Sequence, residues 1–135
     1  MMNAIAQDMM STELLTVYED CSLEEALKLL VNNRITGLPV VNREQKMVGI
    51  ISEYDILKQI FSYEKLNPEI FKEKITFSKS VKSVQENATL AEVMAMFMGE
   101  PFRRLPVVNQ EGRLVGIITR RDLIRIFYYR AKLSG

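Results

Sequence analysis

The sequence contains no histidine and no tryptophan, and it has a single cysteine, Cys21. Without histidine the chain cannot build a Ser-His-Asp triad, a histidine general base or a histidine metal ligand, although carboxylates can still do acid–base chemistry. One cysteine cannot form an internal disulfide, and we interpret it as a plain residue at a helix entry. No nucleophile–base pair, metal cluster or glycine-rich phosphate loop is visible. The composition therefore argues against an enzyme.

Long apolar segments are also missing. No apolar run approaches the roughly 20 residues that cross a bilayer, and the N-terminus lacks the charged-then-apolar pattern of a signal peptide. We therefore expect no membrane association and, by default, a cytoplasmic location. Apolar residues make up 47% of the chain and charged residues 26%, which is typical of a globular domain.

Charge is distributed unevenly along the chain, although the net charge is only +1. Residues 1–100 carry a net charge of −5, and residues 101–135 carry +6. Such asymmetry indicates either an anion-facing second half or a solvated surface. Nucleic-acid binding is disfavoured, because no aromatic residues suited to base stacking are interleaved with the arginines.

The same pattern occurs twice. Residues 17–57 align with residues 84–124 at a constant offset of 67 without a gap, and 15 of the 41 pairs are identical. Self-similarity at a fixed period indicates a repeated structural unit. A unit of about 60 residues would bury only a modest part of its surface alone, so we expect the two copies to fold together.

Each copy has the pattern of a small α/β unit. Ser22 and Thr89 begin sequences that fit a capping box with Glu25 and Glu92, and an apolar helical face follows each of them. Two apolar strands joined by a polar turn then predict an antiparallel hairpin, and a final helix closes the copy. The predicted strands are a lead strand (15–17 and 81–84) and a hairpin (38–41 with 47–51, and 105–108 with 114–118), and a partial helix is expected over 69–75.

The fold class is thus α/β (α+β), with two repeats of roughly β-α-β-β-α topology. We divide the chain into a first repeat with its lead-in segment (1–64), a linker (65–79) and a second repeat (80–135). Gly49 and Gly116 lie inside predicted strands, where glycine often marks a close approach of the backbone to another group. That group is either a ligand or a packed helix.

The ordered motifs resemble the CBS domain, a family named for cystathionine β-synthase. The first copy carries Ser22-Leu23-Glu24-Glu25-Ala26, Gly37-Leu38-Pro39-Val40-Val41, Val48-Gly49-Ile50-Ile51 and Ser52-Glu53-Tyr54-Asp55. The second copy repeats this order and departs once in the strand motif, where Arg104 replaces Gly37. Asp8-Met9-Met10-Ser11 is similar to the lead-in segment of the family.

The resemblance implies two lobes related by a pseudo-two-fold axis, with two clefts between them. Family members that bind ligands commonly take AMP, ADP, ATP, S-adenosylmethionine or NAD there, and paired modules usually assemble as disc-like homodimers. We therefore expect an adenosine nucleotide as the ligand, AMP or ATP first, with no cofactor required.

Ser52 with Asp55, and Thr119 with Asp122, are the sharpest binding candidates. Each pair lies where a strand ends and a helix begins, and unpaired backbone amides there favour an oxygen-rich ligand. In the family the aspartate takes the ribose hydroxyls, and a carboxylate suits a diol because it accepts two hydrogen bonds. The alternative is that both pairs only cap their helices.

The resemblance distributes the remaining candidates over two clefts. Cleft A contains Thr119, Asp122, Arg103, Arg104, Ile117, Met10, Leu15, Thr16 and Ile35. Cleft B contains Ser52, Asp55, Thr36, Gly37, Ile50, Phe77, Lys82, Ser83 and Phe102. Arginine matches phosphate geometry with a planar fork of donors, so we expect cleft A to hold the nucleotide and cleft B to be weaker or empty.

Two functions remain open. The first is a regulatory module that binds an adenosine nucleotide and passes the change to an unidentified partner protein. The second is a ligand-free structural module that dimerises or docks onto an enzyme or transporter. A homodimer through the long helices is expected in either case, because the apolar faces of these helices exceed what so small a chain can cover.

Overall fold

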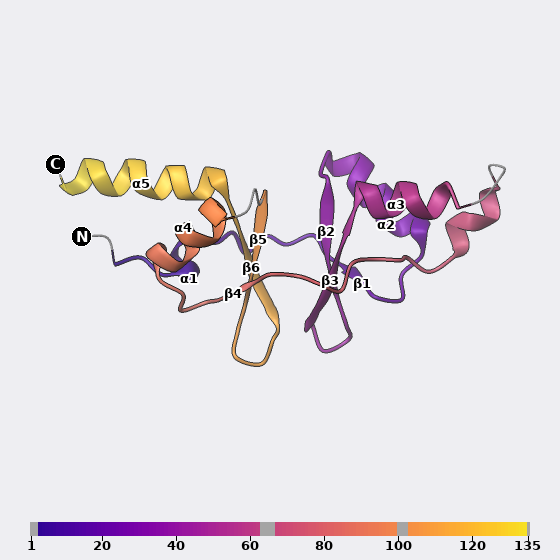
Figure 1. Cartoon of the computed structure of the whole chain (residues 1–135), viewed down its shortest axis with the longest axis horizontal. Coiled ribbons are helices and arrows are strands. Elements are labelled where there is room, and N and C mark those ends of the chain that lie inside the picture. Colours follow the sequence, from indigo (N-terminus) through magenta and orange to yellow (C-terminus); the bar gives the residue numbers. More distant parts are fainter. Residues whose placement is uncertain (1–2, 63–66, 100–102, 135) are drawn as a thin grey trace. The chain divides into compact units, whose positions relative to one another are not determined.

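The computed structural model describes residues 3–62, 67–99 and 103–134, and Figure 1 shows the elements in chain order. The chain forms two compact units. The first-repeat unit is Leu15–Val81, and the second-repeat unit combines Met1–Leu14 with Lys82–Gly135. We predicted three consecutive stretches, 1–64, 65–79 and 80–135. The contacts within the structure instead group the N-terminal segment, Met1–Leu14, with the second repeat.

The first-repeat unit has the order β-α-β-β-α. Its elements are β1 (Val17–Tyr18), α2 (Leu23–Asn33), β2 (Gly37–Val41), β3 (Met47–Ser52), α3 (Glu53–Ile60) and a short 3-10 helix, η1 (Pro68–Lys72). The strands form one sheet in the order β1-β2-β3, in which β1 is parallel to β2 and β3 is antiparallel to β2.

The second-repeat unit repeats this topology. Its elements are α1 (Ala6–Met9), β4 (Val84–Gln85), α4 (Leu90–Gly99), β5 (Arg104–Val108), β6 (Leu114–Thr119) and α5 (Arg120–Ser134). The sheet order is β4-β5-β6, and the register of its hairpin copies that of the first sheet at the offset of 67, including a bulge before the last residue of β5.

The predicted fold class and the predicted hairpins are confirmed. The lead strands begin later than expected, at residues 17 and 84. The expected helix over 69–75 ends at Lys72, because the residues that follow it pair with other parts of the unit. The amide of Ile75 donates to the carbonyl of Cys21, and Ser78 pairs with Ile50, so this stretch lies extended along the sheet instead of continuing a helix.

Helix capping follows the sequence with one correction. The Ser22 and Thr89 hydroxyls accept hydrogen bonds from the amides of Glu25 and Glu92, as expected of N-caps. Neither glutamate side chain bonds back to its cap among the described residues, so the reciprocal half of these two predicted capping boxes is wrong. α3 has a complete capping box, formed by Ser52 with an aspartate.

Each unit has its own apolar core. The fully buried side chains of the first-repeat unit include Leu23, Leu38 and Ile51, and those of the second include Leu105 and Ile118. Leu38 and Ile51 face each other across the first hairpin, and their counterparts Leu105 and Ile118 do so across the second. Burial of such side chains stabilises each unit by roughly 1.5–3 kcal/mol per residue.

The segment before each repeat packs against the sheet of the other repeat. Ser11 exchanges backbone hydrogen bonds with Ile117 in β6, at 2.8 and 3.0 Å, and Ser78 does the same with Ile50 in β3, at 2.9 and 3.0 Å. These segments also explain the strand glycines. A Cβ on Gly116 would overlap the Met10 side chain, and a Cβ on Gly49 would overlap the Ser78 carbonyl and the Phe77 ring. The close approach is therefore to an extended segment, and neither expected alternative, a ligand or a helix, is what these glycines meet.

Candidate functional site

Asp122 lies at the start of α5, with only 7% of its surface exposed. Its Oδ2 accepts hydrogen bonds from the backbone amide of Thr119 at 2.8 Å and from the Thr119 hydroxyl at 2.9 Å. The Asp122 amide in turn donates to the Thr119 Oγ1 at 3.2 Å. Ser52 and Asp55 make the same three bonds at the start of α3, with the same distances.

Both aspartates therefore cap a helix, and this role occupies one carboxylate oxygen of each. The second oxygen differs between the two sites. Oδ1 of Asp122 accepts a hydrogen bond from Arg125 at 2.9 Å, and the Arg125 side chain is 57% exposed. Oδ1 of Asp55 has no such partner among the described residues. Capping and ligand binding are thus compatible, because a ribose diol can address the oxygen that the cap leaves open.

The strand beside each junction carries the residue in which the two repeats differ. In the second sheet Arg104 lies directly opposite Thr119, and in the first sheet Gly37 lies directly opposite Ser52. The arginine is half-buried and is the first residue of β5, the central strand of this sheet. In the second-repeat unit an arginine thus stands in register with the threonine whose amide and hydroxyl bond Asp122 at the helix N-terminus.

The structure places six of the nine cleft A residues in the second-repeat unit. Ser11, next to Met10, pairs with Ile117, and Arg103 directly precedes β5 and is exposed. The six residues are Met10, Arg103, Arg104, Ile117, Thr119 and Asp122. The other three, Leu15, Thr16 and Ile35, belong to the first-repeat unit.

Cleft B divides in the same way. Its residues in the first-repeat unit are Thr36, Gly37, Ile50, Ser52, Asp55 and Phe77, while Lys82 and Ser83 belong to the second-repeat unit. Phe102 lies outside the described residues. Thr36 also has a structural role, because its carbonyl accepts the amide of Glu53 at 3.1 Å at the start of α3.

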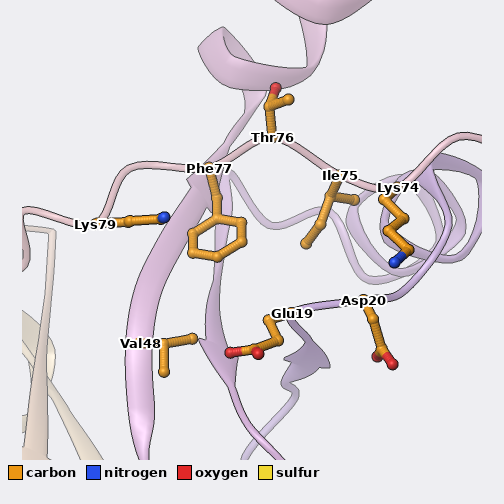
Figure 2. Close-up of a pocket in the computed structure, with 8 residues that line it drawn as sticks. All are labelled: Glu19, Asp20, Val48, Lys74, Ile75, Thr76, Phe77 and Lys79. Atoms are coloured by element: carbon orange, nitrogen blue, oxygen red, sulfur yellow. The ribbon is translucent and has the colours of Figure 1, made fainter.

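A cavity of about 700 Å³ in the first-repeat unit was not predicted from the sequence. Figure 2 shows it beneath the extended segment that carries Ile75 and Phe77, with Glu19 and Val48 on the facing wall. The segment over this cavity has fewer residues between its two backbone contacts than the N-terminal segment that packs on the second repeat. This difference in spacing can be recognised only once the paired residues are known, so it could not be read from the sequence.

Metal and membrane features can be judged over the described part of the chain. It contains no group of three or more histidine, cysteine, aspartate or glutamate residues placed to hold a metal ion. Over the same residues, none of the helices has the length and apolar character that crossing a membrane requires.

Comparison with known proteins gives the family. The family model of the CBS domain matches the chain twice, over residues 6–62 and 73–129. The CBS domain-containing protein CBSX1 from the chloroplast of Arabidopsis thaliana is 33% identical over 77% of this chain, and the match spans 55% of CBSX1.

Two similar solved structures contain adenosine compounds. The crystal structure of CBSX2 in complex with AMP has a TM-score of 0.78 at 31% identity, covering 94% of this chain and 98% of that one; CBSX2 is an Arabidopsis thaliana protein. The CBS domain pair of protein MJ0100, in complex with 5′-methylthioadenosine and S-adenosyl-L-methionine, has a TM-score of 0.71 at 29% identity, covering 95% and 98%. The two family matches, the β-α-β-β-α topology of both units and these likenesses give one conclusion: the chain belongs to the CBS-domain family and is a tandem pair of CBS domains.

Proposed function

We propose that this chain is a regulatory module that binds an adenosine nucleotide, AMP or ATP, through the cleft A residues. The observation that carries the proposal is the position of Arg104 opposite Thr119, beside the capped carboxylate of Asp122. Cation, helix amides and carboxylate together match a ligand with a phosphate at one end and a diol at the other. The AMP complex of CBSX2 supports the choice of ligand class.

In this proposal the ribose hydroxyls replace Arg125 at Oδ1 of Asp122. Arg125 can turn to solvent because its side chain is 57% exposed, and the ribose hydroxyls then take its place as donors to the buried carboxylate. The phosphate lies towards Arg103 and Arg104 and the first amides of α5, where the helix dipole favours an anion. Ile117 supplies apolar contact for the base. The roles of Leu15, Thr16 and Ile35, the remaining members of the set, stay predictions from the family resemblance.

Isothermal titration calorimetry with AMP, ADP, ATP, S-adenosylmethionine and NAD tests the proposal. We expect heat from at least one adenosine compound and at most one strong site per chain. Two equal and independent sites would contradict the assignment to cleft A. Absence of heat and of any thermal shift with every compound would favour the alternative, a ligand-free module that docks onto a partner enzyme or transporter.

We also propose that the chain is a homodimer through the outer faces of its helices. Each unit has an apolar groove between its two helices, and the seven residues that line one groove are the counterparts, at the offset of 67, of the seven that line the other. The lining residues are Leu27, Leu30, Val31, Glu53, Ile56, Leu57 and Ile60 in the first, and Met94, Phe97, Met98, Arg120, Leu123, Ile124 and Phe127 in the second. Large apolar side chains in both remain open, among them Val31 at 70% exposed and Met98 at 78%.

One difference between the grooves indicates how two copies would pair. Glu53 in the α2–α3 groove is replaced by Arg120 in the α4–α5 groove. Opposite charges at matching positions favour an arrangement in which the α2–α3 groove of one copy faces the α4–α5 groove of the other. The like-with-like arrangement would place two glutamates, and two arginines, in equivalent positions.

A cytoplasmic location remains a prediction.

A further inference from the structure

The cavity of the first-repeat unit has an apolar floor and a charged rim. Val48 and Phe77 are half-buried and Ile75 is buried, whereas the four charged residues that complete the lining are exposed. The charged residues are Glu19, Asp20, Lys74 and Lys79. In Figure 2 Ile75 and Phe77 project into the cavity, Thr76 turns away from it, and Lys74 and Lys79 lie at opposite ends. A volume of about 700 Å³ is within the range of small-molecule sites.

The cavity results from a difference between the segments that precede the two repeats, residues 6–11 before the first and residues 75–78 before the second. In the second-repeat unit the amide of Ala6 bonds the carbonyl of Ala88, and Ser11 pairs with Ile117, so five residue steps separate the two contacts. In the first-repeat unit the matching contacts are made by Ile75 and Ser78, only three steps apart. The two additional residues allow the segment before the first repeat, which packs in the second-repeat unit, to form α1. This short helix buries the Met9 side chain to 1% exposure.

Gln59 holds the shorter segment in its position. Its Oε1 accepts the amide of Thr76 at 3.1 Å and the Thr76 hydroxyl at 3.2 Å, and its Nε2 donates to the carbonyl of Lys74 at 2.9 Å. In the second-repeat unit the corresponding amide, that of Gln7, bonds the carbonyl of Glu86 instead. The segment is thus bound to α3 and not to the end of β1. The residue that corresponds to Gln59 at the offset of 67 is Ile126, which cannot make these bonds.

The charges on the rim are of both signs and are only partly paired. Asp20 accepts from Arg43 at 3.1 Å. Glu19, Lys74 and Lys79 make no ion pair and no side-chain hydrogen bond within the described part of the chain. The rim therefore offers one carboxylate and two ammonium groups above an apolar floor. A ligand that satisfies all of them has an anionic group, a cationic group and an apolar body.

We propose that this cavity is a second ligand site that binds a small zwitterion of the apolar amino-acid type. The side chain of the ligand lies on Val48, Ile75 and Phe77, its ammonium group faces Glu19, and its carboxylate faces Lys79 or Lys74. The site shares only Phe77 with the cleft B residues and none with cleft A. The site does not depend on the nucleotide proposal. All of its lining residues belong to the first-repeat unit, so the module could respond to a second ligand that binds to this unit alone.

Binding of three related compounds to the full chain, measured by protein-observed NMR titration, tests the proposal. The probes are L-phenylalanine, 3-phenylpropionate, which lacks the ammonium group, and phenethylamine, which lacks the carboxylate. We expect shifts at cavity residues and an affinity for L-phenylalanine about five-fold higher than for either truncated compound, because each exposed charge pair contributes modestly.

Matched variants assign each preference to a side. Glu19→Gln should remove the preference over 3-phenylpropionate only, and the double variant Lys74→Gln with Lys79→Gln should remove the preference over phenethylamine only. Glu86→Gln, at the position that corresponds to Glu19 in the second repeat, should leave both preferences unchanged. Val48→Trp should fill the cavity and abolish binding, whereas Val115→Trp, its counterpart, should not.

Three results would overturn the site. They are equal affinity of the three compounds, shifts that map outside the cavity, and no binding of L-phenylalanine at tens of millimolar, a concentration that should detect even a dissociation constant of about 1 mM. Displacement of L-phenylalanine by saturating AMP would show that the cavity belongs to a nucleotide site. Absence of AMP binding with retained L-phenylalanine binding would contradict the nucleotide proposal and leave this one standing.

Discussion

Arg125 donates a hydrogen bond to Oδ1 of Asp122 at 2.9 Å, one turn further along α5. Lys58, which occupies the corresponding position in α3, makes no such bond to Asp55 among the described residues. The two otherwise identical capping sites therefore differ in the one carboxylate oxygen that the cap does not use. This difference affects what each aspartate can offer to a ligand.

Asp122→Ala should weaken nucleotide binding more than Asp55→Ala does. Loss of a charge-assisted pair of hydrogen bonds to the ribose costs on the order of 1.5–3 kcal/mol, or about ten- to a hundred-fold in affinity, measured by calorimetry. Wild type should discriminate against 2′-deoxy and 3′-deoxy nucleotides, and the Asp122 variant should not. Arg125→Gln is the matched control, since it removes the competitor at Oδ1 and should retain ribose discrimination.

Asp122→Ala also removes the carboxylate half of a capping box, so the stability of the variant must be measured with its affinity. Ser52 and Thr119 remain as N-caps, and within the capping box each aspartate variant loses only the bonds that its carboxylate accepts from the cap residue. A lowered melting temperature is expected for both, with a loss below the roughly 1 kcal/mol of a whole N-cap. If Asp122→Ala melts earlier while nucleotide affinity and ribose discrimination stay intact, capping is its whole role and the site assignment is wrong.

Charge reversal should reveal how two copies pair. Glu53→Arg and Arg120→Glu should each weaken the homodimer, because each places like charges at matching positions of facing grooves. The double variant should regain at least part of the lost affinity, measured by light scattering across a micromolar dilution series. A wild-type monomer throughout the series would refute the dimer, and equal weakening in the double variant would refute this orientation.

Gly49→Ala should destabilise the fold more than Gly116→Ala. The new methyl group at residue 49 meets the Ser78 carbonyl, which is backbone, and the Phe77 ring, whereas at residue 116 its three nearest neighbours are all atoms of the Met10 side chain. A flexible methionine can move aside, so we expect a loss of about 1–3 kcal/mol in urea unfolding for Gly49→Ala and a smaller one for Gly116→Ala. Gly99→Ala, where a Cβ meets nothing within 4 Å, is the control and should not destabilise. Equal losses at 49 and 116 would contradict this reading of the contacts.

The Cys21 thiol should react slowly with iodoacetamide in the native state. Burial raises its pKa to about 11 from 9.0, with further contributions from the carboxylates of Glu25 and Asp20. The thiolate is the reactive form, so at pH 8 native labelling should be about a hundred-fold slower than labelling in urea. Because the folded pKa exceeds the unfolded one, the protonated thiol stabilises the fold below pH 9, and this contribution is lost between pH 9 and 11. Similar labelling rates with and without urea would contradict the prediction.

Local sequence was sufficient for the hairpins and the helix starts, because these depend on neighbouring residues. The Leu-Pro-Val-Val strands, the polar turns and the Ser/Thr caps all lie where the motifs predict them. The lead segments were harder to predict. The helix at residues 6–9 depends on a contact with Ala88, and the extended stretch at residues 75–78 depends on a contact with Cys21. Both partners lie far away in the sequence.

The candidate site shows the same limit. The Ser/Thr-x-x-Asp motif predicted which residues meet at each helix start, and the repeat alignment showed that Arg104 replaces Gly37. Neither could show that Arg125 occupies the second oxygen of Asp122, because an (i, i+3) pair on a helix forms only when both side chains turn to the same side. The cavity beneath Phe77 depends on Gln59, a residue that looks unremarkable in a helical stretch.

The packing of residues 4–11 against the second repeat has a consequence for the order of events on the ribosome. The chain emerges N-terminus first, and domains tend to fold as units during synthesis. Leu15–Val81 contains every strand of its own sheet and can close once that stretch has emerged. Residues 4–11 must instead wait for Ala88 and Ile117, hydrogen-bond partners that are synthesised much later. We therefore expect residues 4–11 to reach their final position only after the second repeat has been made.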